Sequence, residues 1–393
     1  MNYRVSNSIK QVKPSPIREM TKIIQEAEDV ISFAGGFPYD EYFPSDQLKA
    51  AFDQVFASGK QALQYGLTQG YTPLRELVSE RLRLKGISSH PDNVLITTGS
   101  QQAIDLFSRV MLSPGDVVLT ENPTFLAAIQ SFESHEAKVV GVDGDQEGMD
   151  PEDLENKLKQ YRPKFIYVVP TFSNPDGKVW SEERRKSLLE LACKYDALIL
   201  EDDPYGDIQF HENRRYIPIA AMDDHARVLY TGSFSKTVVP ALRTGWITGP
   251  QPLIQLLIRI KEVADLVSSM TNQQALYYLL KDFDLDRHTK WISQKYYHHM
   301  TMMQDSLKSL RREDISWIEP QGGMFLWMKV QGHVDTAELL KKAVKHGVAF
   351  IPGAPFYIHN PQKNTMRLNF TNASPEKIKA GMDRLLGVLH SIS

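Results

Sequence analysis

The sequence of 393 residues contains a single cysteine, Cys193. One cysteine can form neither a disulfide within the chain nor a cysteine-based zinc cluster. It falls in a helical pattern over residues 181–194, where we expect a buried structural thiol. This scarcity of cysteine predicts a chain suited to the reducing cytoplasm.

Long apolar runs and an excess of one charge are also missing. No stretch of about 18 apolar residues occurs, and the first residues lack the apolar centre of a signal peptide. Lysine and arginine total 45 against 48 acidic residues, a formal net charge of −3. We therefore expect no membrane span, no nucleic-acid partner and no metal centre, but an ordinary globular enzyme.

Between about residues 90 and 250, short β-branched runs alternate with helical stretches, which is typical of a wound α/β sheet. The predicted strands are Val94–Thr98, Val117–Thr120, Lys138–Val142, Phe165–Val169, Ala197–Leu200, Val228–Tyr230 and Gly245–Thr248. These seven strands predict one central sheet.

The pattern changes after residue 285 to a long polar helix over His288–Arg311, followed by strands at Met324–Trp327 and Met366–Phe370. This predicts an α+β subdomain. We expect a large domain over residues 46–285, and a small domain that combines residues 1–45 with 286–393. A helix near residues 16–28 is predicted to pack beside the small domain.

The motif Gly232-Ser-Phe-Ser-Lys236 follows a predicted strand, and Arg243 lies seven residues after the lysine. A lysine amine can form a Schiff base with an aldehyde, while small hydroxyl residues and a fixed cation suit a phosphate. We interpret this motif as a site for pyridoxal phosphate, although a similar spacing also arises by chance in surface loops.

Two other segments supply groups that suit the same coenzyme. Gly99, Ser100 and Gln101 join a strand to a helix over 102–111, so that backbone N–H groups at the helix N-terminus could bind a phosphate; a simple helix cap is the alternative. Asp202 follows a buried strand, where a carboxylate could keep a pyridine nitrogen protonated. A metal ligand or a helix cap are the alternatives for Asp202.

Three further side chains could contact the coenzyme ring. Tyr205 and Asn174 could bond the ring oxygen, although the Asn-Pro and Asp-Gly pairs around Asn174 also favour an ordinary turn. Phe125 could stack on the ring face, or belong to the core.

These motifs, in this order and over nearly the whole chain, resemble the aspartate aminotransferase family of fold type I pyridoxal phosphate enzymes. The resemblance is strongest to the branch of 2-aminoadipate, kynurenine and aromatic aminotransferases. It implies a large α/β domain with a mostly parallel seven-stranded sheet and a smaller α+β domain. It also implies catalysis by Lys236, Asp202 and Tyr205, and a phosphate held by Gly99, Ser100, Gln101, Ser233 and Arg243.

The resemblance also assigns substrate and subunit contacts. Arg367 would bind the substrate carboxylate, and Gly36 would allow a close backbone approach. Arg18 would meet a distal carboxylate, or swing away to admit aromatic and aliphatic side chains; a surface arginine is the alternative. Tyr65 would reach the phosphate of a neighbouring subunit, which implies a homodimer with shared sites.

The expected activity is transfer of an amino group from an L-amino acid to 2-oxoglutarate by a ping-pong mechanism. The same electron sink would support a carbon–sulfur β-lyase, which is the alternative enzyme class. An effector-sensing, aminotransferase-like domain of a transcription regulator is a third interpretation. It is disfavoured because we expect a basic DNA-binding module ahead of such a domain, whereas the motif around Arg18 begins almost at once.

Overall fold

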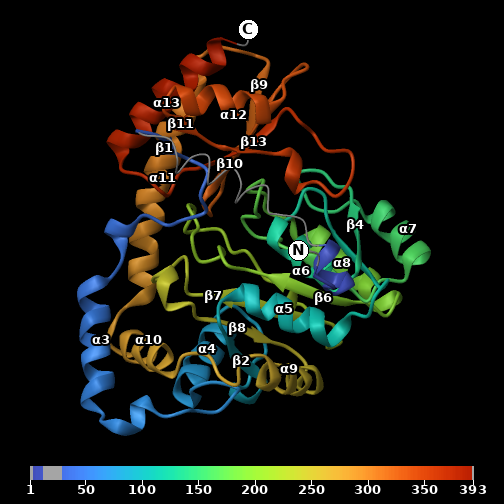
Figure 1. Cartoon of the computed structure of the whole chain (residues 1–393), viewed down its shortest axis with the longest axis vertical. Coiled ribbons are helices and arrows are strands. Elements are labelled where there is room, and N and C mark those ends of the chain that lie inside the picture. The colour runs from blue at the N-terminus through green and yellow to red at the C-terminus, as the bar shows by residue number, and fades with distance from the viewer. Residues whose placement is uncertain (1–2, 12–28, 392–393) are drawn as a thin grey trace.

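The computed structural model describes residues 3–11 and 29–391. Figure 1 shows two packed parts, a lower one built around a large sheet and an upper one that contains the C-terminus, with the long helix α11 running along both. The predicted helix at residues 16–28 and Arg18 lie outside the described residues.

The lower part contains a seven-stranded sheet in the order β2-β8-β7-β6-β5-β3-β4. Its strands are β2 (Val94–Thr97), β3 (Val117–Glu121), β4 (Lys138–Val142), β5 (Phe165–Val168), β6 (Leu198–Asp202), β7 (Val228–Ser233) and β8 (Gly245–Thr248). All seven predicted strands form, and only β8 runs antiparallel to its neighbours. The mostly parallel seven-stranded sheet that the resemblance implies is therefore present.

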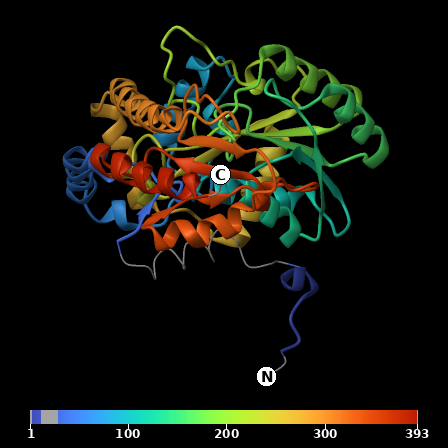
Figure 2. The same cartoon turned by 90° about the horizontal axis from the view of Figure 1, so that it is seen from above.

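Helices cover both faces of this sheet because successive residues of each buried strand point to opposite sides. One face packs on α5 (Ser100–Met111), α6 (Leu126–Ser134) and α9 (Gln251–Ala264). The other packs on α4 (Thr72–Leu84), α7 (Pro151–Tyr161), α8 (Glu182–Lys194) and α10 (Met270–Asp282). Helix α3 (Ser45–Ala57) lies beside α10, and Figure 2 shows it (blue) at the opposite end of the molecule from α7 and α8 (green).

The upper part is built on a four-stranded antiparallel sheet in the order β12-β13-β10-β9. Its strands are β9 (Ile315–Ile318), β10 (Phe325–Val330), β12 (Ile351–Pro352) and β13 (Thr365–Asn369). Its helices are α11 (Leu285–Ser309), α12 (Thr336–Lys345) and α13 (Pro375–His390). This is the α+β arrangement that the sequence predicts after residue 285.

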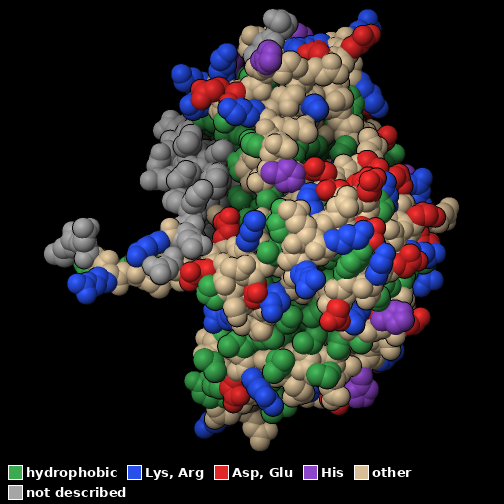
Figure 3. All heavy atoms as spheres, turned by 90° about the vertical axis from the view of Figure 1, so that its right-hand side faces the viewer, with side chains coloured by type: hydrophobic (Ala, Val, Ile, Leu, Met, Phe, Trp, Pro, Cys, Tyr) green, Lys and Arg blue, Asp and Glu red, His purple; other side chains and the backbone are tan. Residues whose placement is uncertain are grey.

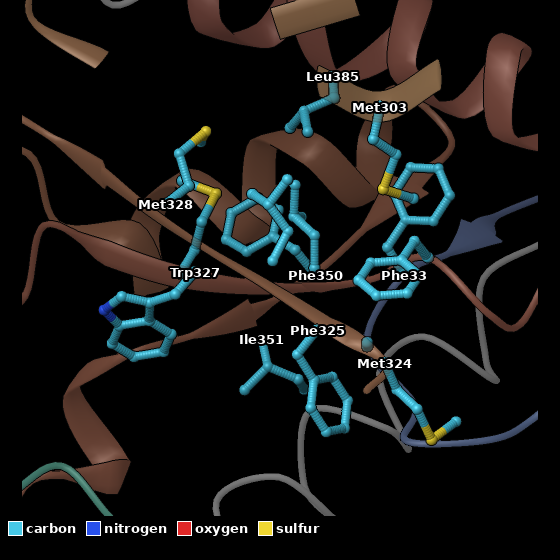
Figure 4. Packing of buried hydrophobic residues seen from close by; sticks show 14 of the residues in the cluster. Phe33, Met303, Met324, Phe325, Trp327, Met328, Phe350, Ile351 and Leu385 are labelled. Carbon is cyan, nitrogen blue, oxygen red and sulfur yellow. The ribbon is translucent and has the colours of Figure 1, made fainter. Parts of the chain in front are cut away.

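The chain segment before the large sheet also joins the upper part. Strand β1 (Ile31–Ser32) pairs in parallel with β11 (Val348–Ala349). The adjacent Phe33 is fully buried in the same hydrophobic cluster as Phe350 and Leu385, as Figure 4 shows. Helix α1 (Asn7–Gln11) lies beside α6. The division at residues 45/46 and 285/286 stays a prediction.

Helix α11 and Cys193 differ from the sequence predictions. Helix α11 begins at Leu285 and not at His288, because the Asp284 side chain caps it by accepting a hydrogen bond from the Arg287 N–H at 2.9 Å. Cys193 is only partly buried, because it lies in the last turn of α8 at the margin of its cluster.

The surface carries both signs of charge. Figure 3 shows basic and acidic side chains interspersed over one face, in keeping with the small net charge. Within residues 3–11 and 29–391, no helix is long and apolar enough to cross a membrane. The cytoplasmic location stays a prediction.

Candidate active site

The carboxyl ends of β5, β6 and β7 meet at one edge of the large sheet, where a cavity of about 370 Å³ opens. Helix α5 begins at this edge because it follows β2, and β13 of the upper part reaches it from the other side. The cavity is lined by Gly36, Ser100, Gln101, Phe125, Leu126, Ala127, Gln130, Val169, Asn174, Asp202, Pro204, Tyr205, Ser233, Ser235, Lys236, Arg243 and Arg367. Ligands of open α/β sheets bind at such an edge.

Asp202 ends β6 and lines this cavity. Its side chain is buried, and Oδ2 accepts a hydrogen bond from the Tyr167 hydroxyl at 2.8 Å. Oδ1 is also buried, but it has no hydrogen-bond partner in the described part of the chain. Burial raises the pKa of Asp202 to about 7, against the lowering effect of the Tyr167 hydroxyl. An orphaned acceptor of this kind fits a protonated ring nitrogen.

Lys236 lies just beyond β7, and its Nζ donates to the Gly36 carbonyl at 2.8 Å. Burial, together with the nearby cations Arg243 and Arg367, lowers the pKa of Lys236 to about 8. A lysine with this pKa has a much larger neutral, nucleophilic fraction near neutrality than an ordinary lysine.

The cavity lining includes serine hydroxyl groups, the guanidinium of Arg243 and the N-terminus of α5. The Ser233 hydroxyl donates to Ser235 at 2.8 Å, and Arg243 donates to the same Ser235 hydroxyl at 3.4 Å. Gly99 precedes α5 with φ 77°, and a Cβ there would lie 2.6 Å from Arg243 Nη2. Only glycine leaves room for the guanidinium, and the resulting arrangement suits a phosphate.

Arg367 enters the cavity from β13 as a buried cation. It donates to Asn174 Oδ1 at 2.6 Å and to the Ala34 carbonyl at 2.8 Å, and it stacks 4.2 Å from the Phe325 ring centre. Its buried Nε has no hydrogen-bond partner, and no carboxylate pairs with it, among the described residues. Burial lowers the pKa of Arg367 to about 10. A planar guanidinium that is buried and has no carboxylate partner among the described residues fits an incoming carboxylate.

Asn174 links Arg367 to Tyr205. The Asn174 side-chain amide donates to the Tyr205 hydroxyl at 3.3 Å, so both groups face the same volume. Burial raises the pKa of Tyr205 to about 12, which keeps the phenol protonated at neutral pH. Phe125 also lines the cavity, immediately before α6.

Two predicted site residues do not line this cavity. Gly99 acts by admitting Arg243, as described above. Tyr65 is 76% exposed and lies outside the chain's own cavity, beside the exposed Leu63 and Leu67. Arg18 is outside the described residues.

Sequence reasoning missed several lining residues, including Ser235, Gln130 and Val169, and also missed Tyr167 behind Asp202. Ser235 stands inside the lysine motif, so its hydroxyl was a usable signal. Tyr167 carried a weaker signal, as the one polar side chain in the strand Phe165–Val168.

In the described part of the chain, no group of three His, Cys, Asp or Glu residues is placed to hold a metal ion.

Comparisons with known proteins identify the family of this chain. The model of the family "aminotransferase class I and II" matches residues 28–385. The chain is 40% identical to aromatic-amino-acid aminotransferase 1 of Thermococcus litoralis over 95% of this chain and 91% of that one. It is 35% identical to 2-aminoadipate transaminase of Thermus thermophilus over 95% and 94% of the two chains.

A solved structure supports the same assignment. The structure of kynurenine aminotransferase from Pyrococcus horikoshii, in complex with PMP, superimposes with a TM-score of 0.93 at 38% identity, covering 99% of this chain and 97% of that one. The resemblance, the fold type and the cofactor that the motifs predicted are thereby confirmed. The chain belongs to the class I and II aminotransferases, and is a transaminase of amino acids and oxo acids that depends on pyridoxal 5′-phosphate.

Proposed function

We propose that this transaminase takes the amino group of an L-amino acid with a 2-aminoadipate, aromatic or aliphatic side chain and passes it to 2-oxoglutarate in a ping-pong cycle. The observation that carries the proposal is one cavity holding the lysine of lowered pKa, the carboxylate with an open oxygen and the unpaired arginine. Relatives named for aromatic, 2-aminoadipate and kynurenine substrates support the range of donors.

The residues around the cavity would hold the cofactor by complementary groups. When bound, pyridoxal phosphate supplies an aldehyde that reacts with amines and a cationic ring that withdraws electrons from the substrate Cα. Asp202 would accept from the ring nitrogen through Oδ1, Asn174 and Tyr205 would bind the ring oxygen, and Phe125 would cover one face. The phosphate would be held by Gly99, Ser100, Gln101, Ser233 and Arg243.

Lys236 would then move the proton. With the cofactor bound, the Lys236 Nζ would take up the proton that leaves the substrate Cα and return it later in the transfer. A pKa of about 8 suits both directions of transfer near neutral pH. The Gly36 carbonyl, 2.8 Å from Nζ, would fix the amine in place while it is free.

Arg367 would orient the substrate through its carboxylate. The guanidinium is already held by Asn174 and the Ala34 carbonyl and stacked on Phe325, so little further ordering is needed when a carboxylate binds. The proposed role of Arg18 toward a distal carboxylate stays a prediction.

Changing Arg367 to lysine is expected to lower kcat/KM for L-amino acids about 100-fold or more, because lysine keeps the charge but loses the planar fork. The measurement is steady-state kinetics with an L-amino acid and, in parallel, single-turnover reaction with a simple primary amine that lacks a carboxylate. The simple amine is expected to react about equally with both proteins. Equal losses for both substrates would contradict carboxylate binding by Arg367.

We also propose a homodimer in which Tyr65 completes the neighbour's phosphate site. Phe56, Leu63, Tyr65 and Leu67 are all exposed within a short stretch of this chain, an apolar grouping that a second subunit would cover. Sedimentation equilibrium is expected to give twice the chain mass. Changing Tyr65 to phenylalanine is expected to weaken cofactor binding without changing that mass. A monomeric holoenzyme would contradict the proposal.

The decisive experiment for the reaction uses a panel of L-amino acids added to holoenzyme without an oxo acid. Each true donor is expected to convert the visible absorbance band of the bound cofactor to the pyridoxamine form in one half-reaction. Addition of 2-oxoglutarate is then expected to restore the band. Failure to restore it would remove 2-oxoglutarate as acceptor, and release of pyruvate and ammonia from cystathionine without any oxo acid would favour the β-lyase.

A further inference from the structure

Tyr167 bonds the Asp202 carboxylate but does not itself line the cavity. Tyr167 of β5 is in register with Leu200 of β6, and Asp202 lies two residues beyond Leu200. Because residues two apart share a face of a strand, the side chains of Tyr167, Leu200 and Asp202 lie on the same face of the sheet. The Tyr167 hydroxyl reaches diagonally to Asp202 Oδ2 at 2.8 Å.

The ring of Tyr167 is fixed by its surroundings. It is fully buried, and Phe132 of α6 packs against it edge to face with ring centres 5.5 Å apart. Among the described residues, the Asp202 carboxylate is the one hydrogen-bond partner of this buried phenol. The hydroxyl therefore holds the carboxylate through Oδ2 and leaves Oδ1 without a hydrogen-bond partner among the described residues.

The charge of Asp202 depends on opposing influences. Burial and the neighbouring Asp203 raise its pKa, and the Tyr167 hydrogen bond lowers it. The charged groups that share the cavity with Asp202 are Lys236, Arg243 and Arg367, with the phenol of Tyr205 beside them. In the described part of the chain, Tyr167 is the one side chain that bonds this carboxylate, so removing its hydroxyl would favour the neutral carboxyl.

We propose that Tyr167 is a positioning residue for the cofactor: its hydroxyl binds one oxygen of an ionised Asp202, so that the other oxygen faces the pyridine nitrogen and keeps it protonated. The inference rests on the assignment of Asp202 to that nitrogen made above. Tyr167 itself would contact neither substrate nor cofactor, and it would act only through Asp202.

The test is Tyr167→Phe, reconstituted with pyridoxal phosphate labelled with ¹⁵N in the ring. The phenylalanine keeps the ring that packs on Phe132 and removes only the donor. The ¹⁵N resonance at neutral pH is expected to move from the protonated position toward that of a neutral pyridine. The dissociation constant of the cofactor, measured by equilibrium dialysis of the apoprotein, is expected to rise about tenfold or more. An unchanged ¹⁵N resonance would overturn the proposal.

Two companion variants separate the possible causes. Phe132→Leu removes the packing partner and leaves the hydrogen bond; it is expected to lower the melting temperature without moving the ¹⁵N resonance. Asp202→Asn is expected to move the resonance at least as far as Tyr167→Phe. If Asp202→Asn does not move it, the assignment of Asp202 is wrong and the inference falls with it. If only Tyr167→Phe fails to move it, the assignment survives and the inference alone is wrong.

A second measurement applies if Tyr167→Phe does not fold. In a crystal structure of the wild-type holoenzyme, the Tyr167 hydroxyl is expected within hydrogen-bond distance of Asp202 Oδ2, with Oδ1 facing the ring nitrogen. A hydroxyl directed elsewhere in the holoenzyme would overturn the proposal.

Discussion

Replacing Lys236 by arginine is expected to lower kcat by at least about 10⁴-fold, because the variant would lose both the amine that we propose binds the cofactor aldehyde and the base that we propose moves the proton. Arginine keeps a positive charge at this position but stays protonated at any pH at which proteins are stable, so it can serve neither role. The measurement is a single-turnover reaction of the reconstituted variant with an L-amino acid, followed by absorbance.

Lys178 offers a matched control. It is also a largely buried lysine, but its Nζ pairs with Asp176 at 3.0 Å, and the pKa of Lys178 is raised by that carboxylate, whereas the pKa of Lys236 is lowered. Lys178→Arg keeps the ion pair and is expected to retain most of the activity. A fully active Lys236→Arg enzyme would refute the assignment of the catalytic lysine and, with it, the proposed route of the proton.

The lowered pKa of Lys236 also has a consequence for cofactor uptake. The amine attacks an aldehyde only when neutral, so uptake of pyridoxal phosphate by the apoprotein is expected to speed up about tenfold per pH unit below pH 8 and to level off above it. An ordinary lysine would keep accelerating until the pH passed about 10.4. Stopped-flow absorbance of the apoprotein, with Lys236→Arg as the blank, measures this profile.

Much of this site could be predicted from the sequence because its groups stand next to strong local signals. The lysine motif, Asp202 and Asn174 each follow a run of apolar residues that forms a strand, and the carboxyl ends of parallel strands meet at one edge. Gly99 precedes a helix, which is a recognisable place for a phosphate. These features depend on a few consecutive residues.

The features of the site that could not be predicted depend on which strands are neighbours and on the register in which those strands pair. The predicted strand ended at Leu200, because Glu201 and Asp202 are acidic, yet both are buried and belong to β6. Glu201 is tolerated there because it accepts hydrogen bonds from the backbone N–H groups of Ile219 and Ala220, which lie far along the chain. The contact of Tyr167 with Asp202 likewise requires β5 to lie beside β6 in one particular register, and spacing in the sequence does not define that.

Replacing Asp202 by alanine is expected to lower kcat about 10³-fold, which is the second large effect. Asp202 supplies the one carboxylate in the cavity lining, and its Oδ1 has no hydrogen-bond partner in the described part of the chain. Without this acceptor the nitrogen loses its proton at neutral pH, and a neutral ring stabilises the negative charge that develops on the substrate Cα far less well. Single-turnover kinetics with an L-amino acid measures the loss.

A chemical rescue distinguishes this explanation from general damage to the site. A cofactor analogue methylated on the ring nitrogen carries a permanent positive charge, and the space vacated by the carboxylate in Asp202→Ala can take the methyl group. If Asp202 serves to keep the ring cationic, the analogue is expected to recover a large part of the lost rate in Asp202→Ala. In the wild-type protein the same methyl group would meet the carboxylate held by Tyr167, so the analogue is expected to bind less well there. An analogue that helps neither protein would mean that Asp202 acts on the reaction by some route other than the charge of the ring.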